Sequence, residues 1–210
     1  ALLDAEGRCV ARSEEALDAL GNCATELKLS KARLWSPETP YLYTLRTRLT
    51  VDGLTVDETT NKVGVRTIHV DDKGFHLNGK LRKFQGVCLH HDLGPLGSAV
   101  NRAALIRQIR ILKDMGCDAI RTAHNMPSTM QMEICDSMGM MVMAESFDMW
   151  LYPKCKNGYA RFFKEWADRD IRNLVLANRL HPSNVMWSVG NEIPEQWSAE
   201  GAKILRHLQD

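Results

Sequence analysis

Residues 117–144 read CDAIRTAHNMPSTMQMEICDSMGMMVMA, and this stretch decides the fold class. Apolar runs over residues 117–121 and 140–144 predict two short strands, the second of them buried on both faces. Between them, Ser128 followed by Gln131 is typical of a helix start, and Gly139 is typical of a helix end. A strand, a helix and a second strand in this order predict parallel strands joined by a right-handed crossover.

The same alternation continues on both sides of this stretch. Further strands are predicted at residues 84–88 and 184–189, and further helices from Asn101 to Gly116, around residues 160–179 and from Ser198 onward. Four such units occupy about 127 residues, and eight would need about 250, the usual length of a β/α barrel. No Gly-rich phosphate loop follows any strand, which disfavours a nucleotide-binding sheet. We therefore expect residues 73–210 to form the first four βα units of a (β/α)8 TIM barrel.

The first 72 residues have a different pattern. Residues 44–51 alternate polar and apolar side chains, Asp52-Gly53 predicts a turn, and residues 54–58 begin a return strand. A further strand is predicted over residues 63–70. This pattern is typical of an all-β immunoglobulin-like sandwich, which needs about 100 residues. We expect residues 1–72 to be the C-terminal part of such a domain, preceded by a segment outside this chain.

Composition excludes several classes of protein. The 210 residues carry 27 Lys and Arg against 26 Asp and Glu, so the near-zero net charge of +1 argues against nucleic-acid binding. There is no run of 18 apolar residues, so no membrane span is predicted. Six cysteines without C-x-x-C spacing are expected to be buried free thiols, Cys88 and Cys117 in particular. Free thiols favour a reducing compartment, and we expect a cytoplasmic location.

Polar and ionisable residues follow every predicted strand of the second region. In a β/α barrel, functional side chains lie at the carboxyl ends of the strands, so these positions are the candidates for a site. They are His90, His91 and Asp92 after the first strand, Arg121, Thr122, His124 and Asn125 after the second, Glu145, Asp148 and Trp150 after the third, and Asn191 and Glu192 after the fourth.

Glu192 is the strongest single candidate, because it follows the apolar or small residues 185–190 abruptly. A carboxyl group at the end of a buried strand is expected to be partly desolvated, which raises its pKa and suits a general acid. Asn191 beside it can donate and accept hydrogen bonds, as sugar hydroxyls require. The alternative is a Glu that only caps a helix.

The histidines allow two interpretations. His90, His91, Asp92 and His124 could hold a metal ion, but two adjacent ligands and a distant one are weak spacing for a metal site. A hydrogen-bonding cluster in a polar pocket is favoured, so we predict no metal and no cofactor. Arg121 should either pair with a carboxylate or contact substrate.

Large apolar side chains near the strand ends also have two interpretations. Trp150 and Trp187 are either platforms on which a sugar ring stacks or parts of the core. The seven methionines between residues 126 and 143 are expected to fill the core.

Several segments, in order along the chain, resemble glycoside hydrolase family 2. Residues 178–192, NRLHPSNVMWSVGNE, resemble the acid/base signature of that family. Residues 120–125 with 135–139 resemble its other signature. Residues 86–97, GVCLHHDLGPLG, look like its first barrel strand and loop, and residues 34–43, LWSPETPYLY, resemble the sandwich domain before the barrel.

The resemblance implies a retaining exo-β-glycosidase, with the β-galactosidase branch the most similar. It implies that Glu192 is the general acid and then the base, and that Asn191 binds the hydroxyl next to the anomeric carbon. His90, His124 and Asp92 are expected to belong to the substrate-binding group.

By the same resemblance, Arg121 orients the nucleophile, with Glu145 and Trp187 in supporting positions. The family's nucleophile is a Glu at the end of the seventh barrel strand, and only four strands are predicted here. We therefore expect this chain to carry the acid/base without the nucleophile and to be inactive by itself. Ala144 stands where relatives often carry Asp, and no Glu-x-His pair of magnesium ligands follows the third strand.

Alternatives remain for the activity. They are a β-glucuronidase or another family 2 β-glycosidase, a non-catalytic carbohydrate-binding fragment, and a metal-dependent hydrolase that uses the histidine cluster. The expected partner is a small-molecule β-glycoside or oligosaccharide, and the whole protein is expected to be a homo-oligomer.

Overall fold

The structure is a computed structural model that describes all 210 residues. Its strands are β1 (Leu2–Leu3), β2 (Cys9–Ala11), β3 (Tyr43–Val51), β4 (Leu54–Val63), β5 (Ile68–Asp71), β6 (Gly74–Leu77), β7 (Lys80–Arg82), β8 (Gly86–His90), β9 (Ala119–Ala123), β10 (Met141–Glu145) and β11 (Asn184–Ser188). The helices are α1 (Arg102–Asp114), α2 (Thr129–Met138), α3 (Ala160–Asn178) and α4 (Ala199–Gln209). None of the four combines the length and the apolar character that crossing a membrane requires.

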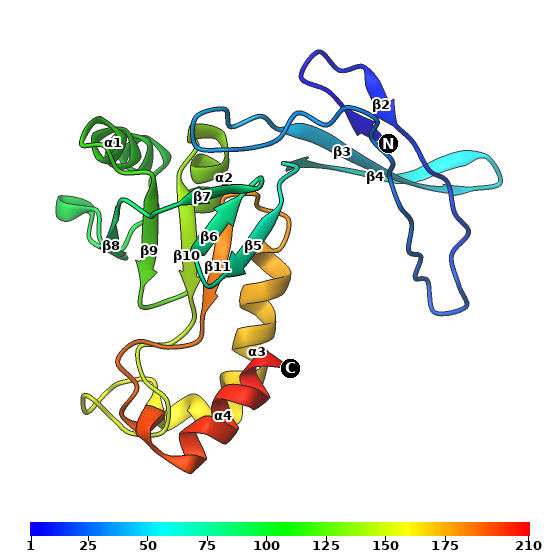
Figure 1. Cartoon of the computed structure of the whole chain (residues 1–210). Helices are drawn as coiled ribbons and strands as arrows, with labels where there is room; N and C mark the ends of the chain where they lie inside the picture. The colour runs from blue at the N-terminus through cyan, green and yellow to red at the C-terminus, as the bar shows by residue number, and fades with distance from the viewer.

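A parallel sheet of β8, β9, β10 and β11 is the centre of the molecule, and each strand pairs with the next along the chain. Helices α1, α2 and α3 connect these strands and cover one face of the sheet (Figure 1). Leu105 and Ile109 of α1, Met132 of α2 and Leu174 of α3 belong to one buried cluster. This arrangement confirms the prediction of successive βα units of a barrel.

Alternation along β10 decides which side chains face the helices. Val142 and Ala144 are fully buried in the cluster beneath α1, α2 and α3. Met141 belongs to a different cluster, on the opposite face. Because side chains alternate along a strand, Glu145 lies on the same face as Met141, which is the inner face of a barrel.

The predicted helix starts are confirmed by their caps. The side chains of Asn101, Ser128 and Ser198 accept hydrogen bonds from backbone N–H groups in the first turns of α1, α2 and α4. The strands start later than predicted, β8 at Gly86 and β9 at Ala119. The residues just before them are held by other contacts, since the Asp118 carboxylate accepts from the backbone of Gln85.

Residues 1–66 supply an antiparallel sheet in the order β2-β1-β3-β4. The long β3–β4 ribbon reaches away from the parallel sheet (Figure 1), and its turn lies at Asp52-Gly53, as predicted. The expectation of one strand over residues 63–70 is wrong. β4 ends at Val63, and Arg66 turns instead toward the barrel, where its guanidinium donates to the backbone carbonyls of Pro182 and Asn184.

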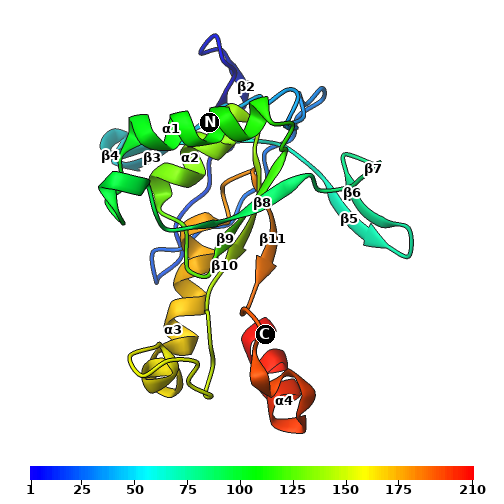
Figure 2. The same cartoon turned by 90° about the vertical axis from the view of Figure 1, so that its left-hand side faces the viewer.

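A third sheet, β5-β6-β7, packs against the amino-terminal ends of the parallel strands. Phe75 and Leu77 of β6 are buried together with Ala119, Met141 and Val185. In Figure 2, α1 and α2 lie on one side of the parallel strands and this small sheet on the other. The hairpin of β5 and β6 straddles the expected domain boundary between residues 72 and 73, which stays a prediction.

The junction between the two regions is both apolar and hydrogen-bonded. Trp35 is fully buried, and its indole Nε1 donates to the backbone carbonyl of Asp136 at the end of α2, at 2.8 Å. The Asp136 carboxylate in turn lies 2.5 Å from Nδ1 of His181 and accepts from the backbone of Ser183 at 3.0 Å. The N-terminal region is therefore tied to the connection that leads into β11.

The cysteines differ from expectation. All six are free thiols, but only Cys135 is buried, and its burial raises the pKa of the thiol. Cys88 is exposed because it lies on β8, the outermost parallel strand, although Arg121 Nη1 donates to its sulfur at 3.4 Å. Of the methionines, Met132 and Met140 are fully buried as predicted, whereas Met126 is exposed.

Two glycines with positive φ allow a test of the junction. Gly139 (φ 71°) ends α2, and a Cβ there would lie 2.3 Å from the carbonyl oxygen of Pro37. Gly116 (φ 91°) follows α1, and a Cβ there would meet nothing within 4 Å. Gly116→Ala should cost about 1 kcal/mol, from backbone strain alone. Gly139→Ala should cost about 3 kcal/mol, because the clash with Pro37 is added.

The measurement is urea unfolding of the full-length protein, followed by tryptophan fluorescence. Equal losses in the two variants would show that Pro37 does not pack against the end of α2.

Candidate active site

Glu145 is the centre of the polar cluster at the carboxyl ends of the strands. Its side chain is fully buried, yet four hydrogen-bond contacts reach its two oxygens. Arg121 donates through Nε to Oε2 at 2.8 Å and through Nη2 to Oε1 at 2.9 Å. Ser188 donates to Oε2 at 2.6 Å, and His124 Nδ1 lies 2.7 Å from Oε1. The carboxylate therefore joins β9, β10 and β11 at one level.

These contacts determine the tautomer of His124. A carboxylate only accepts hydrogen bonds and a guanidinium only donates them. The proton on Nδ1 of His124 must therefore point at Glu145, and the 3.2 Å approach of Arg121 Nη2 to the same nitrogen is a packing contact. Nε2 of His124 is left for another partner. The peptide bond between Ala123 and His124 is cis.

Asn191 is held through all of its polar groups. Its backbone N–H donates to the carbonyl of Phe147 at 2.9 Å, and its backbone carbonyl accepts from Lys154 Nζ at 2.7 Å. The side-chain oxygen accepts from Arg121 at 2.7 Å, and the side-chain nitrogen donates to Asp148 at 3.1 Å. With a donor on one side and an acceptor on the other, the amide has only one favourable orientation.

Charge reinforces this network. Partial burial lowers the pKa of the Arg121 guanidinium, but hydrogen bonds to Glu145 and attraction to its charge raise it, and the net shift is upward. Partial burial raises the pKa of Asp148, but hydrogen bonds from Asn191 and Lys154 lower it, and the net shift is downward. Both groups therefore stay ionised around neutral pH.

Glu192 follows Asn191 at the start of the loop after β11. Its backbone lies in the left-handed region, with φ at 44°, and its side chain is exposed. The expectation that the Glu192 carboxyl is partly desolvated is therefore wrong for the described residues. Only the first part of β11 is buried, the strand becomes more exposed toward Trp187, and none of the described residues covers the carboxyl group of Glu192.

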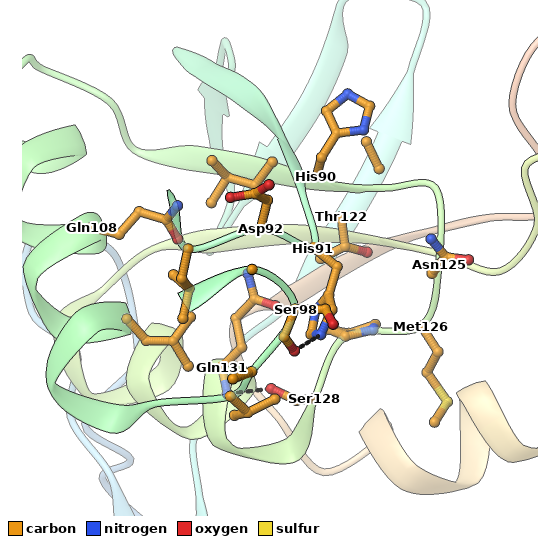
Figure 3. Close-up of a pocket in the computed structure, with 18 residues that line it drawn as sticks. His90, His91, Asp92, Ser98, Gln108, Thr122, Asn125, Met126, Ser128 and Gln131 are labelled. Carbon is orange, nitrogen blue, oxygen red and sulfur yellow. Dashed lines mark hydrogen bonds between the residues drawn. The ribbon is translucent and has the colours of Figure 1, made fainter. Parts of the chain in front are cut away.

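The predicted cluster of His90, His91, Asp92 and His124 does not form, because neighbouring residues of β8 point to opposite sides of the sheet. Figure 3 shows His90 and His91 pointing to different sides, as alternation along β8 requires. The rings of His90 and His124 lie 5.1 Å apart, edge to face, so His90 joins the site. His91 instead lies 2.9 Å from the carbonyl of Ser98.

Asp92 is also on the far side, where its carboxylate accepts from the backbone of Gly94 at 2.5 Å. With His91 it lines a small pocket between the loop after β8 and the helices α1 and α2 (Figure 3). The structure therefore brings together Arg121, His124, Glu145, Asn191 and His90, but not Asp92. No three His, Cys, Asp or Glu side chains of the chain converge in a way that could hold a metal ion.

The two tryptophans have different environments. Trp150 is 3% exposed, and its Nε1 donates to the carbonyl of Val189 at 2.8 Å, so it is a core residue. Trp187 on β11 is 38% exposed, which leaves its ring available to a ligand.

Two members of the network were not found from sequence. Ser188 could have been found, because parallel pairing places it opposite Glu145 at the end of β11. Lys154 had no such signal, since it lies in an irregular loop nine residues beyond β10. Chemically, the site offers a rigid amide, an imidazole nitrogen and a nearby carboxyl group, a combination that suits hydroxyl-rich ligands and proton transfer.

Two sequence profiles match the chain, one after the other. A profile described as "Glycosyl hydrolases family 2, TIM barrel domain" matches residues 68–209, and one described as "Glycosyl hydrolases family 2" matches residues 2–66.

Curated relatives carry the names of two kinds of β-glycosidase. The chain is 46% identical over 209 residues to a protein from Bacteroides ovatus named beta-galactosidase BoGH2A, with 97% of this chain and 25% of the relative covered. It is 39% identical to a putative beta-glucuronidase from Formosa agariphila, with 91% of this chain and 18% of the relative covered. The chain thus spans about a quarter or less of the length of these relatives.

Solved structures have the same fold. A glycosyl hydrolase family 2 member from Bacteroides cellulosilyticus superposes with a TM-score of 0.92 at 39% identity, over 99% of this chain and 27% of that one. A β-D-glucuronidase from Dictyoglomus thermophilum superposes with a TM-score of 0.84 at 26% identity, over 99% of this chain and 36% of that one.

The buried position of Glu145 predicts a large effect of neutralising it. Glu145→Gln keeps the shape but leaves the Arg121 guanidinium without its counter-charge, and it turns an amide N–H toward groups that donate. Removing one partner of a buried ion pair costs about 3 to 5 kcal/mol.

Glu133→Gln is the control for that substitution. Glu133 pairs with Arg102 at 3.9 Å with both side chains 57% exposed, so its loss should cost less than about 0.5 kcal/mol. Urea unfolding of the full-length variants measures both, and similar values for the two would contradict the role of Glu145.

Proposed function

Because this chain belongs to glycosyl hydrolases family 2, we propose that the protein containing it is a retaining exo-β-glycosidase that removes terminal β-linked sugars. The observation that carries the proposal is the position of Glu192. It follows directly on Asn191, an amide held rigidly by Arg121 and Asp148 at the carboxyl ends of parallel strands. In a β/α barrel this end is where catalytic groups lie.

In the proposed reaction, Glu192 acts twice. It first donates its proton to the glycosidic oxygen, while a nucleophile forms a bond to the anomeric carbon, the bond from that carbon to the glycosidic oxygen breaks, and the leaving group departs as an alcohol. Glu192 then takes a proton from a water whose oxygen bonds to the anomeric carbon, the bond to the nucleophile breaks, and the sugar is released. Asn191 binds the hydroxyl next to the anomeric carbon, using the N–H and the lone pair that its protein contacts leave free.

The second carboxylate is proposed to be a Glu outside residues 1–210. A retaining glycosidase needs its two carboxyl groups about 5 to 5.5 Å apart across the scissile bond. Glu145 does not suit the part of nucleophile, since it is fully buried and both its oxygens already accept hydrogen bonds. We propose that Glu145 instead positions Arg121 and His124, and that residues 1–210 alone are inactive.

His90 and His124 are proposed to line the sugar site, with Trp187 beside it. The side-chain contact between the two histidines and the unused Nε2 of His124 support this role. Asp92 is proposed to affect substrate binding indirectly, by holding the loop after β8 in shape. Its carboxylate accepts a hydrogen bond from the backbone of Gly94, on the other side of the strand from His90.

A neutral sugar, most simply a β-galactoside, is the proposed substrate. The relative named a beta-galactosidase is 46% identical, against 39% for the putative beta-glucuronidase. The charges of the site agree, because Arg121 is already paired with Glu145 and Lys154 with Asp148. A glucuronide carboxylate would need a cation of its own, and these two cations are already engaged by carboxylates.

The test is a screen of chromogenic β-glycosides with the full-length protein. Turnover of the β-galactoside above the β-glucuronide is expected. Preference for the glucuronide would support the alternative activity, and binding of sugar without any turnover would support a non-catalytic carbohydrate-binding protein. We further propose that the whole protein is a homo-oligomer.

Glu192→Gln should keep the fold, since the side chain is exposed and the two residues are nearly isosteric. Loss of the acid should lower kcat for an unactivated disaccharide on the order of 10²- to 10⁴-fold. An aryl glycoside with a good leaving group should lose less in its first step.

Glu200→Gln, an exposed carboxyl in the first turn of α4, is the matched control and should leave both rates unchanged. Near wild-type turnover of the disaccharide by Glu192→Gln would overturn the acid/base role.

Activity should survive removal of metal ions. His90 and His91 point to different sides of β8, and Nδ1 of His124 is occupied by Glu145, so these side chains do not converge on one ion. Dialysis of the full-length protein against a strong chelator is expected to leave kcat within about twofold. Stoichiometric zinc, with activity lost on its removal and restored on its return, would be evidence for the metal-dependent hydrolase instead.

A further inference from the structure

We propose that Lys154 is a positioning residue that holds the Asn191–Glu192 segment in its working conformation, acting together with Asp148. The proposal rests on the function proposed above, since it concerns how the acid/base is placed. Lys154 does not contact the carboxyl group of Glu192. It acts through the backbone and the side chain of Asn191.

The ammonium group of Lys154 lies between two acceptors. It donates to the backbone carbonyl of Asn191 at 2.7 Å and to Oδ1 of Asp148 at 3.2 Å. The same Oδ1 of Asp148 accepts from the side-chain amide of Asn191 at 3.1 Å. Lys154, Asp148 and Asn191 thus form a closed ring of three hydrogen bonds, each with a charged donor or acceptor, which makes them stronger than neutral ones.

The carbonyl that Lys154 binds belongs to the peptide group between Asn191 and Glu192. Fixing this carbonyl fixes the plane of the peptide, and therefore the direction in which Glu192 leaves it. Glu192 has φ at 44°, a left-handed conformation that is unfavourable for a residue with a Cβ. Contacts outside the residue must hold such a conformation, and the Lys154 contact is adjacent to it.

Asp148 needs Lys154 for a second reason. Its side chain is 39% exposed and that of Lys154 is 23% exposed, so the pair is partly shielded from water. The carboxylate accepts from Asn191 and thereby fixes the orientation of the amide, whose oxygen faces Arg121. Without the ammonium, Oδ1 of Asp148 loses its charged partner and keeps only the Asn191 amide, so the carboxylate is freer to turn.

The loop that carries Lys154 is itself well anchored. The loops after β10 and β11 run side by side in Figure 1, and they are joined by contacts that do not involve Lys154. Asn191 donates to the carbonyl of Phe147 at 2.9 Å, Trp150 to that of Val189 at 2.8 Å, and the backbone of Tyr152 to Oε1 of Glu195 at 2.6 Å. Replacing Lys154 should therefore leave the loop in place and disturb mainly the peptide before Glu192.

The experiment compares two leaving groups in the full-length protein. Substrates are a dinitrophenyl β-glycoside, which needs little acid assistance, and an unactivated disaccharide of the same sugar, which needs it fully. Lys154→Met should lower kcat for the disaccharide on the order of 10- to 100-fold, because displacement of a catalytic group by about 1 Å has effects of this size. For the activated substrate the loss should be less than about threefold, and KM should change little.

Matched variants make the result specific. Lys154→Arg keeps the charge and the donor and should retain most of the disaccharide activity. Lys156→Met removes an exposed ammonium from the same loop and should have no effect. Lys154→Gln, which keeps an N–H donor without the charge, is measured in parallel with melting temperatures, so that a folded variant is available if Lys154→Met unfolds.

Each outcome decides the matter. An equal loss on both substrates, or no loss on either, in a folded Lys154 variant would overturn the proposal. A wild-type protein that hydrolyses neither substrate would instead overturn the proposed function.

Discussion

The rest of the site depends on the ion pair between the buried carboxylate of Glu145 and the guanidinium of Arg121. A fully buried charge is costly unless it is paired and hydrogen-bonded, and here the requirement is met by Arg121, His124 and Ser188. These hydrogen bonds hold the carboxyl ends of β9, β10 and β11 next to one another. Nη2 of Arg121 donates one N–H to Glu145 and its other N–H to Asn191, so the same ion pair also positions the residue before Glu192.

The residues of the site become more exposed with distance from this ion pair. Glu145 is fully buried, Asn191 is 8% exposed, and Asp148 and Lys154 at the edge have side chains 39% and 23% exposed. Regular strands supply the innermost groups, whereas loops supply the outer ones. This order suits the glycosidase activity that we propose, in which rigid groups hold the sugar and the residue that moves a proton faces the ligand.

The fold and part of the site could be predicted from local sequence. The alternation of apolar runs with capped helices predicts the βα units, and the caps at Asn101, Ser128 and Ser198 are found where the sequence places them. Strand ends are also readable, which is why Arg121, Glu145 and Asn191 could be named as candidates. Their pairing does not follow from the sequence, since hydrogen bonds between strands depend on register and not on spacing along the chain.

The type and order of the elements follow from the local sequence, because capping and side-chain periodicity are local properties. Which candidates share a site depends on how the strands and loops pack in three dimensions. Because side chains alternate along β8, His90 lies in the site and His91 lies outside it. The irregular loop after β10 places Lys154 in contact with Asn191, although the two residues are 37 positions apart in the sequence. The exposure of Glu192 and Cys88 likewise follows from this packing, because burial depends on which other elements cover a strand.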